Sequence, residues 1–167
     1  APVSSEDLIS TVKKILSNKQ SFTIRAGGTS IGGQAIGDGI LIDVSKHLTN
    51  IINFSVHKKE VVVEPGVILD DLNDFLKPYN LKFAPDTSTS NRSMIGGMIG
   101  NNSCGAYSLI YGTTREHLKS VEVILSDGSL VTFRELTQSE LEHKMSLSTL
   151  EGDIYRFVLN LLSNKSK

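Results

Sequence analysis

The sequence is poor in cysteine, the residue that builds disulfide frameworks and thiolate metal sites, since its 167 residues include only one. A single cysteine excludes an internal disulfide and any metal site that needs several thiolates. The four histidines show no metal-ligand spacing with one another or with the cysteine; they are His47, His57, His117 and His143. We therefore predict no metal site, and the cysteine content favours a reducing cytoplasm.

The chain also lacks an excess of charge of either sign. Lys and Arg total 17 and Asp and Glu total 18, which gives a formal net charge of −1. Nucleic-acid grooves carry clustered Lys and Arg, so this balance gives no reason to expect a nucleic-acid partner. The sequence has neither an apolar run of membrane-spanning length nor a signal-peptide pattern. Its length and its 39% content of hydrophobic residues fit one substantial globular domain with its own core.

Glycine, by contrast, is concentrated in two segments of the chain. Residues 25–33 have the sequence RAGGTSIGG, and residues 94–105 have the sequence MIGGMIGNNSCG. Glycine takes positive φ without steric cost and lets backbone approach a ligand closely. Successive N–H groups in such a loop can form a concave anion site. We interpret both segments as loops around a large phosphorylated ligand, with an ordinary turn as the alternative for the first segment taken alone.

The hydrophobic pattern predicts an α+β domain. One helix begins after Ser4 or Ser5, a second covers residues 69–76 and ends near Pro78, and a last helix follows Ser148, which has capping-box spacing to Glu151. Strands are predicted over residues 22–25, 40–44, 51–55, 60–64, 121–125 and 129–133, the last two joined by a hairpin at Asp127-Gly128. Residues 83–92 are predicted to be irregular. This order lacks a regular βαβ alternation.

The glycine-rich segments do not match the common phosphate-binding motifs. A Walker A loop needs a lysine directly after its last glycine, and a Rossmann fingerprint needs Gly-x-Gly-x-x-Gly inside a βαβ unit. The first segment has neither feature. A kinase-type loop is excluded because no catalytic-loop or magnesium-binding motif follows. What remains is a loop that offers backbone N–H groups and the hydroxyls of Thr29 and Ser30 to a phosphate, without a compensating lysine.

Five motifs, in order, resemble those of the FAD-binding domain of the vanillyl-alcohol oxidase/PCMH flavoprotein family. They are RAGGTS (25–30), VEPGV (63–67), PDTS (85–88), IGGMIGNN (95–102) and YGTTR (111–115). The likeness is greatest to the branch with D-lactate, glycolate and D-2-hydroxyglutarate dehydrogenases. The resemblance implies a two-lobed α+β domain with FAD between the lobes, one lobe over residues 1–66 and the other over 67–167, and with no cap domain.

The resemblance also implies a set of cofactor-binding residues. In this family the first segment cradles the FAD pyrophosphate, and the second passes along the ribityl chain and the flavin ring. For Asp86 a turn or cap role is the alternative, and for Arg115 an exposed surface position. The expected cofactor-binding residues are Ala26, Gly27, Gly28, Thr29, Ser30, Ile31, Pro85, Asp86, Thr87, Gly96, Gly97, Asn101, Ser103 and Gly105.

Covalent attachment of the flavin is not expected. Some members of the family link it through a histidine in the first segment, where this chain has Thr29. Others add a cysteine link shortly before the glycines of the second segment, whereas Cys104 follows them. We therefore expect non-covalent FAD, and we expect Cys104 to be a small packed residue.

The chemistry that the resemblance implies is oxidation of a 2-hydroxy acid by hydride transfer to flavin N5. D-lactate, glycolate and D-2-hydroxyglutarate are the candidate substrates. A sugar-lactone oxidase or an alkyl-glycerone-phosphate synthase-like enzyme is the alternative within the same fold, and a non-catalytic binding domain is the alternative from another class. In the family the general base and the cations that hold the substrate come largely from other parts of the chain. No catalytic residue is assigned here, and we expect this chain alone to be inactive.

The last predicted helix carries a broad apolar face, and the chain stops shortly after it. We interpret the chain as a piece of a longer protein that ends before a cap domain, with docking of the helix on this domain's own core as the alternative. Partial loss of flavin and self-association through this helix are the corresponding expectations. The expected compartment is the cytoplasm, with a place at the inner membrane face left open.

Overall fold

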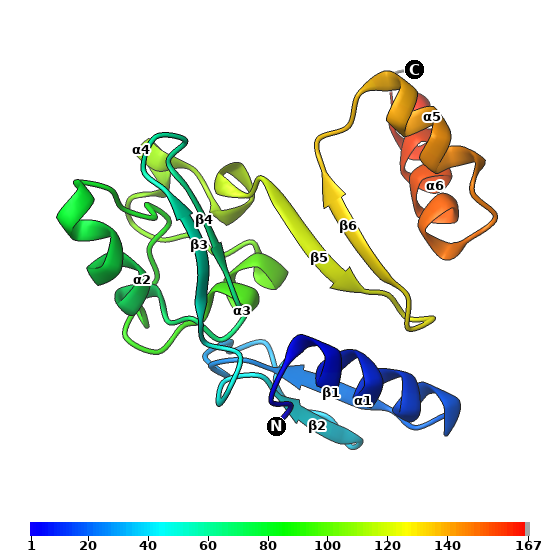
Figure 1. Ribbon diagram of the computed structural model, residues 1–167, viewed down its shortest axis with the longest axis horizontal. Helices are drawn as coiled ribbons and strands as arrows, with labels where there is room; N and C mark the ends of the chain where they lie inside the picture. The colour runs from blue at the N-terminus through cyan, green and yellow to red at the C-terminus, as the bar shows by residue number, and fades with distance from the viewer. Residues whose placement is uncertain (166–167) are drawn as a thin grey trace. The chain divides into compact units, whose positions relative to one another are not determined.

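The computed structural model describes residues 1–165 and divides into two compact units, Ala1–Leu118 and a second unit that begins at Lys119 (Figure 1). Each unit is α+β, as the sequence predicts, and the strands form three separate two-stranded sheets. The first unit contains both glycine-rich segments. The lobe boundary near residue 66, which the resemblance defines by the position of FAD, stays a prediction.

The chain begins with helix α1 (Ser5–Ser17), which confirms the first predicted helix. The hydroxyl of Ser4 accepts a hydrogen bond from the backbone N–H of Asp7 at 3.2 Å, the usual N-cap arrangement. Strands β1 (Phe22–Arg25) and β2 (Ile40–Asp43) follow as a parallel pair. Strand β1 runs directly into the first glycine-rich segment, so it fixes where that segment begins.

The main core of the first unit lies around helix α2 (Leu69–Leu76). Strands β3 (Ile51–Ser55) and β4 (Glu60–Val63) form an antiparallel pair whose apolar side chains pack against it. A short 3-10 turn, η1 (Lys77–Tyr79), ends α2 at Pro78, as predicted. The buried side chains of this core belong to Val67, Leu69, Leu72, Leu76, Ile95 and Met98.

The second glycine-rich segment is largely helical, which corrects its interpretation as a loop. Helix α3 (Ile95–Asn101) contains three glycines, each a poor helix former. Ile95 and Met98 lie one helical turn apart and are 5% and 2% exposed. Burial of this face outweighs the low helix propensity. Only residues 102–107 continue as an irregular segment before α4 (Ser108–Tyr111) and the 3-10 turn η2 (Thr114–His117).

Helix α3 is held against its neighbours through close backbone contacts at its first turn. The N–H of Ile95 donates to the carbonyl of Val67, and the N–H of Gly96 donates to the carbonyl of Pro65, both at 2.9 Å. A Cβ at Gly96 would lie 2.5 Å from the Cβ of Pro65. Because that distance is far inside van der Waals contact, only glycine fits at residue 96.

The second unit begins with the predicted hairpin, strands β5 (Ser120–Ile124) and β6 (Leu130–Arg134), and continues with helices α5 (Gln138–Ser146) and α6 (Leu150–Lys165). Neither α4 nor α5 was predicted from the sequence. The predicted capping box at Ser148 is wrong, because the carboxylate of Glu151 instead accepts a hydrogen bond from Lys144 at 2.6 Å. On α6, Phe157 is 64% exposed, so the expected apolar face is not covered there by the described part of this chain.

Two glycines of α3 provide a matched test of its packing. Gly100→Ala places a methyl group in open space, so we expect it to raise the free energy of unfolding by roughly 0.5–1 kcal/mol through helix propensity. Gly96→Ala forces a methyl group into Pro65 and should lower the free energy of unfolding by roughly 1–3 kcal/mol. Urea denaturation followed by circular dichroism measures both. Equal effects of the two substitutions would contradict this packing.

The start of α5 provides a test by pH. The Glu140 carboxylate accepts from the Arg134 guanidinium and from the backbone N–H and hydroxyl of Thr137, and these bonds lower its pKa to about 2. A lowered pKa stabilises the folded unit above about pH 4.5, and this contribution is lost as the pH falls through about 2. NMR titration of the Glu140 carboxyl carbon should give this value, and Arg134→Gln should raise it. A pKa of Glu140 near the ordinary value of 4.5 in the unsubstituted chain would rule out the hydrogen bonds with Arg134 and Thr137.

Candidate functional site

The first glycine-rich segment stays open as a loop, and glycine is required at its start. A Cβ at Gly27 would overlap the backbone carbonyl of Arg92. Gly28 has a φ of +61°, in the left-handed region that side chains disfavour. The loop therefore lies with its backbone directly on the segment that precedes α3, and this contact determines the position of residues 26–30.

Four consecutive backbone N–H groups in this loop have no partner in the part of the chain that the structure describes. The N–H groups of Gly27, Gly28, Thr29 and Ser30 donate no hydrogen bond there. Backbone donors in folded proteins are almost always paired, with protein or with solvent. A run of unpaired donors in a glycine-rich turn is suited to accept an anion whose oxygens contact several of them at once.

Arg25 brings a positive charge to the same loop, which sequence reasoning did not assign to the site. A Cβ at Gly28 would lie 2.7 Å from its Nε and 2.9 Å from its Nη2, so the guanidinium folds back against the loop. The loop lacks the lysine of a Walker A motif, and this guanidinium provides a fixed charge in its place. The available signal in the sequence was an arginine two residues before the first glycine.

The structure brings the first loop and α3 together, as the sequence analysis expects for a shared site. A Cβ at Gly97 would lie 3.6 Å from the Cβ of Ala26, an ordinary contact distance. The hydroxyl of Ser30 donates to Oε1 of Gln34 at 2.6 Å, and Nε2 of Gln34 donates to Oδ1 of Asn101 at 3.4 Å. Gln34 was also missed by sequence reasoning, because nothing in its local sequence indicates a contact with α3.

The segment that contains Pro85, Asp86 and Thr87 is bound to its surroundings through its own side chains. Pro85 is fully buried, and the Thr87 hydroxyl lies 2.8 Å from the hydroxyl of buried Ser93. Oδ1 of Asp86 accepts from the backbone N–H of Tyr107 at 3.2 Å. Asp86 thus joins this segment to the residues that follow α3, in agreement with the turn or cap alternative. Its contact with a cofactor stays a prediction.

The remaining predicted residues differ in how they are placed. A Cβ at Gly105 would overlap the side chain of Asp86, so this glycine permits the contact between the two segments. The carbonyl of Ser103 accepts from both the N–H and the hydroxyl of Thr114, at 3.1 and 2.8 Å. Ile31 projects fully into solvent and joins none of these contacts. Cys104 is exposed, so the expectation that it is packed is wrong.

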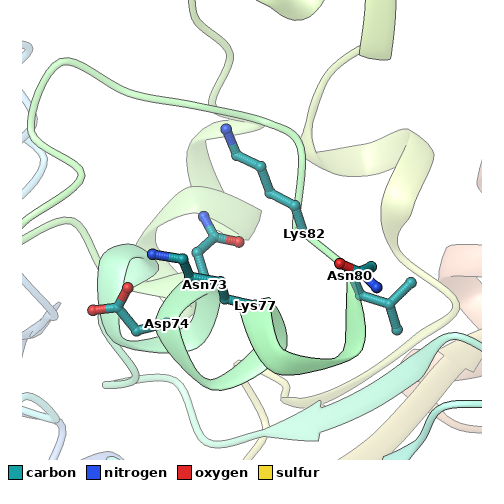
Figure 2. A pocket seen from close by; sticks show the side chains of 6 residues that line it. Asn73, Asp74, Lys77, Asn80 and Lys82 are labelled. Atoms are coloured by element: carbon teal, nitrogen blue, oxygen red, sulfur yellow. The ribbon is translucent and has the colours of Figure 1, made fainter.

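A hollow in the first unit is lined by none of these residues. It has a volume of about 420 Å³ and is formed by α2, η1 and the residues after them (Figure 2). Its lining residues are Asn73, Asp74, Lys77, Asn80, Leu81 and Lys82. None of the predicted cofactor-binding residues belongs to it. The ammonium of Lys82 lies 5.3 Å from the ring centroid of Tyr107, a cation–π distance.

Residues 1–165 contain neither a metal-binding cluster nor a membrane-spanning helix. No group of three or more His, Cys, Asp and Glu side chains is placed to hold a metal ion. No helix in that range is long and apolar enough to cross a membrane. The groups that the site residues present are backbone N–H donors and a guanidinium, with amide and hydroxyl groups beside them.

Comparison with curated proteins finds relatives over most of the chain. D-2-hydroxyglutarate dehydrogenase of Escherichia coli (strain K12) is 42% identical over 137 residues, which are 82% of this chain and 14% of that protein. D-2-hydroxyglutarate dehydrogenase of Pantoea ananatis (strain AJ13355) is 39% identical over 138 residues, which are 83% of this chain and 14% of that protein. The chain thus spans about a seventh of the length of these relatives.

Comparison with solved structures shows the fold. The crystal structure of 6-hydroxy-D-nicotine oxidase from Arthrobacter nicotinovorans matches with a TM-score of 0.70 at 20% sequence identity. The match covers 83% of this chain and 30% of that one. The family model of the FAD binding domain matches residues 1–134, which include every predicted cofactor-binding residue. The chain belongs to this family of FAD-binding domains.

Proposed function

We propose that this chain is the FAD-binding part of a flavin-dependent dehydrogenase that oxidises a 2-hydroxy acid, with D-2-hydroxyglutarate as the first candidate and D-lactate and glycolate as the others. The observation that carries the proposal is the run of unpaired N–H groups from Gly27 to Ser30 beside Arg25. The names of the relatives support the substrate class, since the most similar curated proteins include D-2-hydroxyglutarate dehydrogenases at 39% and 42% identity.

The negative charge and the acceptor oxygens of the FAD diphosphate match the groups that this loop presents. The diphosphate oxygens are acceptors only, and the loop presents four donors in succession at Gly27–Ser30. The positive φ of Gly28 lets neighbouring N–H groups turn toward one point. The Arg25 guanidinium adds a charge that does not titrate near neutral pH. Thr29 stands where some members of the family have the histidine that links the flavin, so non-covalent binding is part of the proposal.

The second segment contributes along the rest of the cofactor. Asn101 stands at the end of α3, and its Nδ2 is free to donate to a ribityl hydroxyl or a phosphate oxygen. Gly96 and Gly97 act chiefly by bringing α3 against Pro65 and Ala26. When bound, FAD supplies the two-electron acceptor that takes a hydride from the α-carbon of the hydroxy acid, which leaves a 2-oxo acid and a proton. No residue of this chain is assigned as the base for that proton.

The place of FAD between two lobes, the self-association of the chain and its compartment are further predictions. FAD is expected between lobes that divide near residue 66. Self-association is expected through the exposed apolar face of α6, which includes Phe157 and Leu161. The expected compartment is the cytoplasm.

Retention of FAD and its dependence on Thr29 test the proposal directly. We expect the purified chain to show a flavin spectrum and to release FAD on heating, which a covalent link would prevent. Thr29→Asp should weaken FAD binding at least tenfold, because a carboxylate beside the diphosphate repels it. Thr29→Ser keeps the hydroxyl and should stay within about threefold. Flavin fluorescence titration measures all three proteins, and equal affinities of the Asp and Ser variants would count against the proposed site.

The oxidoreductase part of the proposal is tested in a chimera. This chain would replace the matching segment of the Escherichia coli relative, which is 42% identical over 137 residues. We expect the chimera to bind FAD and to lose its oxidised-flavin absorbance when D-2-hydroxyglutarate is added without oxygen. A folded, flavin-loaded chimera that no 2-hydroxy acid reduces would contradict this part alone.

A further inference from the structure

Gln34 connects two parts of the site that lie far apart in the sequence. Its Oε1 accepts from the hydroxyl of Ser30 at 2.6 Å, and its Nε2 donates to Oδ1 of Asn101 at 3.4 Å. The contact with Asn101 spans 67 positions of the chain. We propose that Gln34 is a positioning residue that holds the first glycine loop to the end of α3 and sets the direction of the hydrogen bonds offered to FAD. This inference rests on the proposed function.

The local backbone is shaped to admit the Gln34 side chain. A Cβ at Gly32 would lie 2.7 Å from Oε1 of Gln34, so a side chain at residue 32 would displace the amide. Gly33 has a φ of +84°, which turns the chain directly before Gln34. The N–H of Ile36 then donates to the carbonyl of Gly33 at 3.1 Å and closes the turn. The second glycine pair of the RAGGTSIGG segment thus serves the placement of Gln34.

The direction of the hydrogen bonds from Ser30 to Gln34 and from Gln34 to Asn101 decides which donors remain for a ligand. Ser30 gives its only hydroxyl proton to Gln34, so its hydroxyl cannot also donate to a phosphate. Asn101 accepts from Gln34 through Oδ1, which leaves the two N–H donors of its amide free. The donors available to an acceptor ligand are therefore the backbone N–H groups of the loop and the Asn101 amide. In this proposal Ser30 therefore serves through its backbone N–H and not through its hydroxyl.

Two substitutions at Gln34 separate positioning from simple packing. Gln34→Leu removes both hydrogen bonds at similar size and should weaken FAD binding about tenfold at pH 7. Gln34→Glu still accepts from Ser30 but cannot donate to Asn101, and its charge repels the diphosphate, so the loss should exceed tenfold. Gln20→Leu is the matched control, since Gln20 is exposed and its side chain joins no hydrogen bond in the described chain. Flavin fluorescence titration should place the control within twofold of the unsubstituted chain.

The pH profile of the Gln34→Glu variant is the readout that a merely structural role would not change. A glutamate carboxyl ordinarily has a pKa of about 4.3, and in its protonated form it donates one hydrogen bond and accepts another, as glutamine does. The affinity of this variant for FAD should therefore rise toward that of the unsubstituted chain as the pH falls through this range. The Gln34→Leu variant should show no such recovery.

Each outcome decides the inference. Unchanged FAD affinity in Gln34→Leu, or a Gln34→Glu variant without recovery at low pH, would overturn it while leaving FAD binding intact. If the unsubstituted chain binds no FAD, the proposed function fails, and the ¹⁵N heteronuclear NOE of the cofactor-free chain then tests whether Gln34 holds the loop to Asn101. The NOE values of the loop N–H groups at residues 27–33 should be lower in Gln34→Leu than in Gln20→Leu. Equal values in the two variants would overturn the inference.

Discussion

The close approach of glycine backbone to neighbouring backbone is the constraint on which the site depends. Gly27 lies under the carbonyl of Arg92, and Gly96 lies against Pro65, at distances that leave no room for a Cβ. These contacts hold the first loop and α3 in the same place although they are far apart in the sequence. Because the loop is supported from outside, its N–H groups need no hydrogen bonds within the loop and stay available to a ligand.

In the proposed function, this arrangement lets a chain with a net charge of −1 hold a doubly charged diphosphate. The positive potential is local, from four backbone N–H dipoles and the guanidinium of Arg25. No lysine is needed, and none lies in residues 25–33. Gln34 adds a side-chain contribution in our proposal. Its Nε2 donates to Oδ1 of Asn101, so the acceptor of that amide is occupied and its two N–H donors are left for a ligand. The site is thus built from fixed dipoles, whose orientation depends on packing.

Much of the fold follows from local patterns in the sequence. The helix after Ser4, the positions of the six strands, the end of α2 near Pro78 and the hairpin at Asp127-Gly128 are all confirmed. Each of these has a cap, a breaker or a period that acts over a few residues. Three helices, α3, α4 and α5, were missed or misassigned. Helix α4 has only four residues. Helix α3 contains glycines and forms because Ile95 and Met98 are buried, and no residue of α5 is fully buried by the described part of the chain.

The site was predictable where it depends on motifs and not where it depends on distant contacts. The glycine motifs identified the loop and its family, and the family match over residues 1–134 confirms that assignment. Arg25 and Gln34 could not be assigned, since their roles depend on how the chain folds back onto Gly28 and Asn101. Cys104 shows the same limit, because the usual burial of a free cysteine did not apply at this exposed position.

The most direct test of the account is an NMR titration of the ¹⁵N-labelled chain with FAD. The account predicts that the amide signals of Gly27, Gly28, Thr29 and Ser30 move most, because their N–H groups gain acceptors on binding. The side-chain amide of Asn101 should move with them. Signals that move mainly in the hollow at residues 73–82, with the glycine loop unchanged, would contradict the central claim that these N–H groups form the diphosphate site.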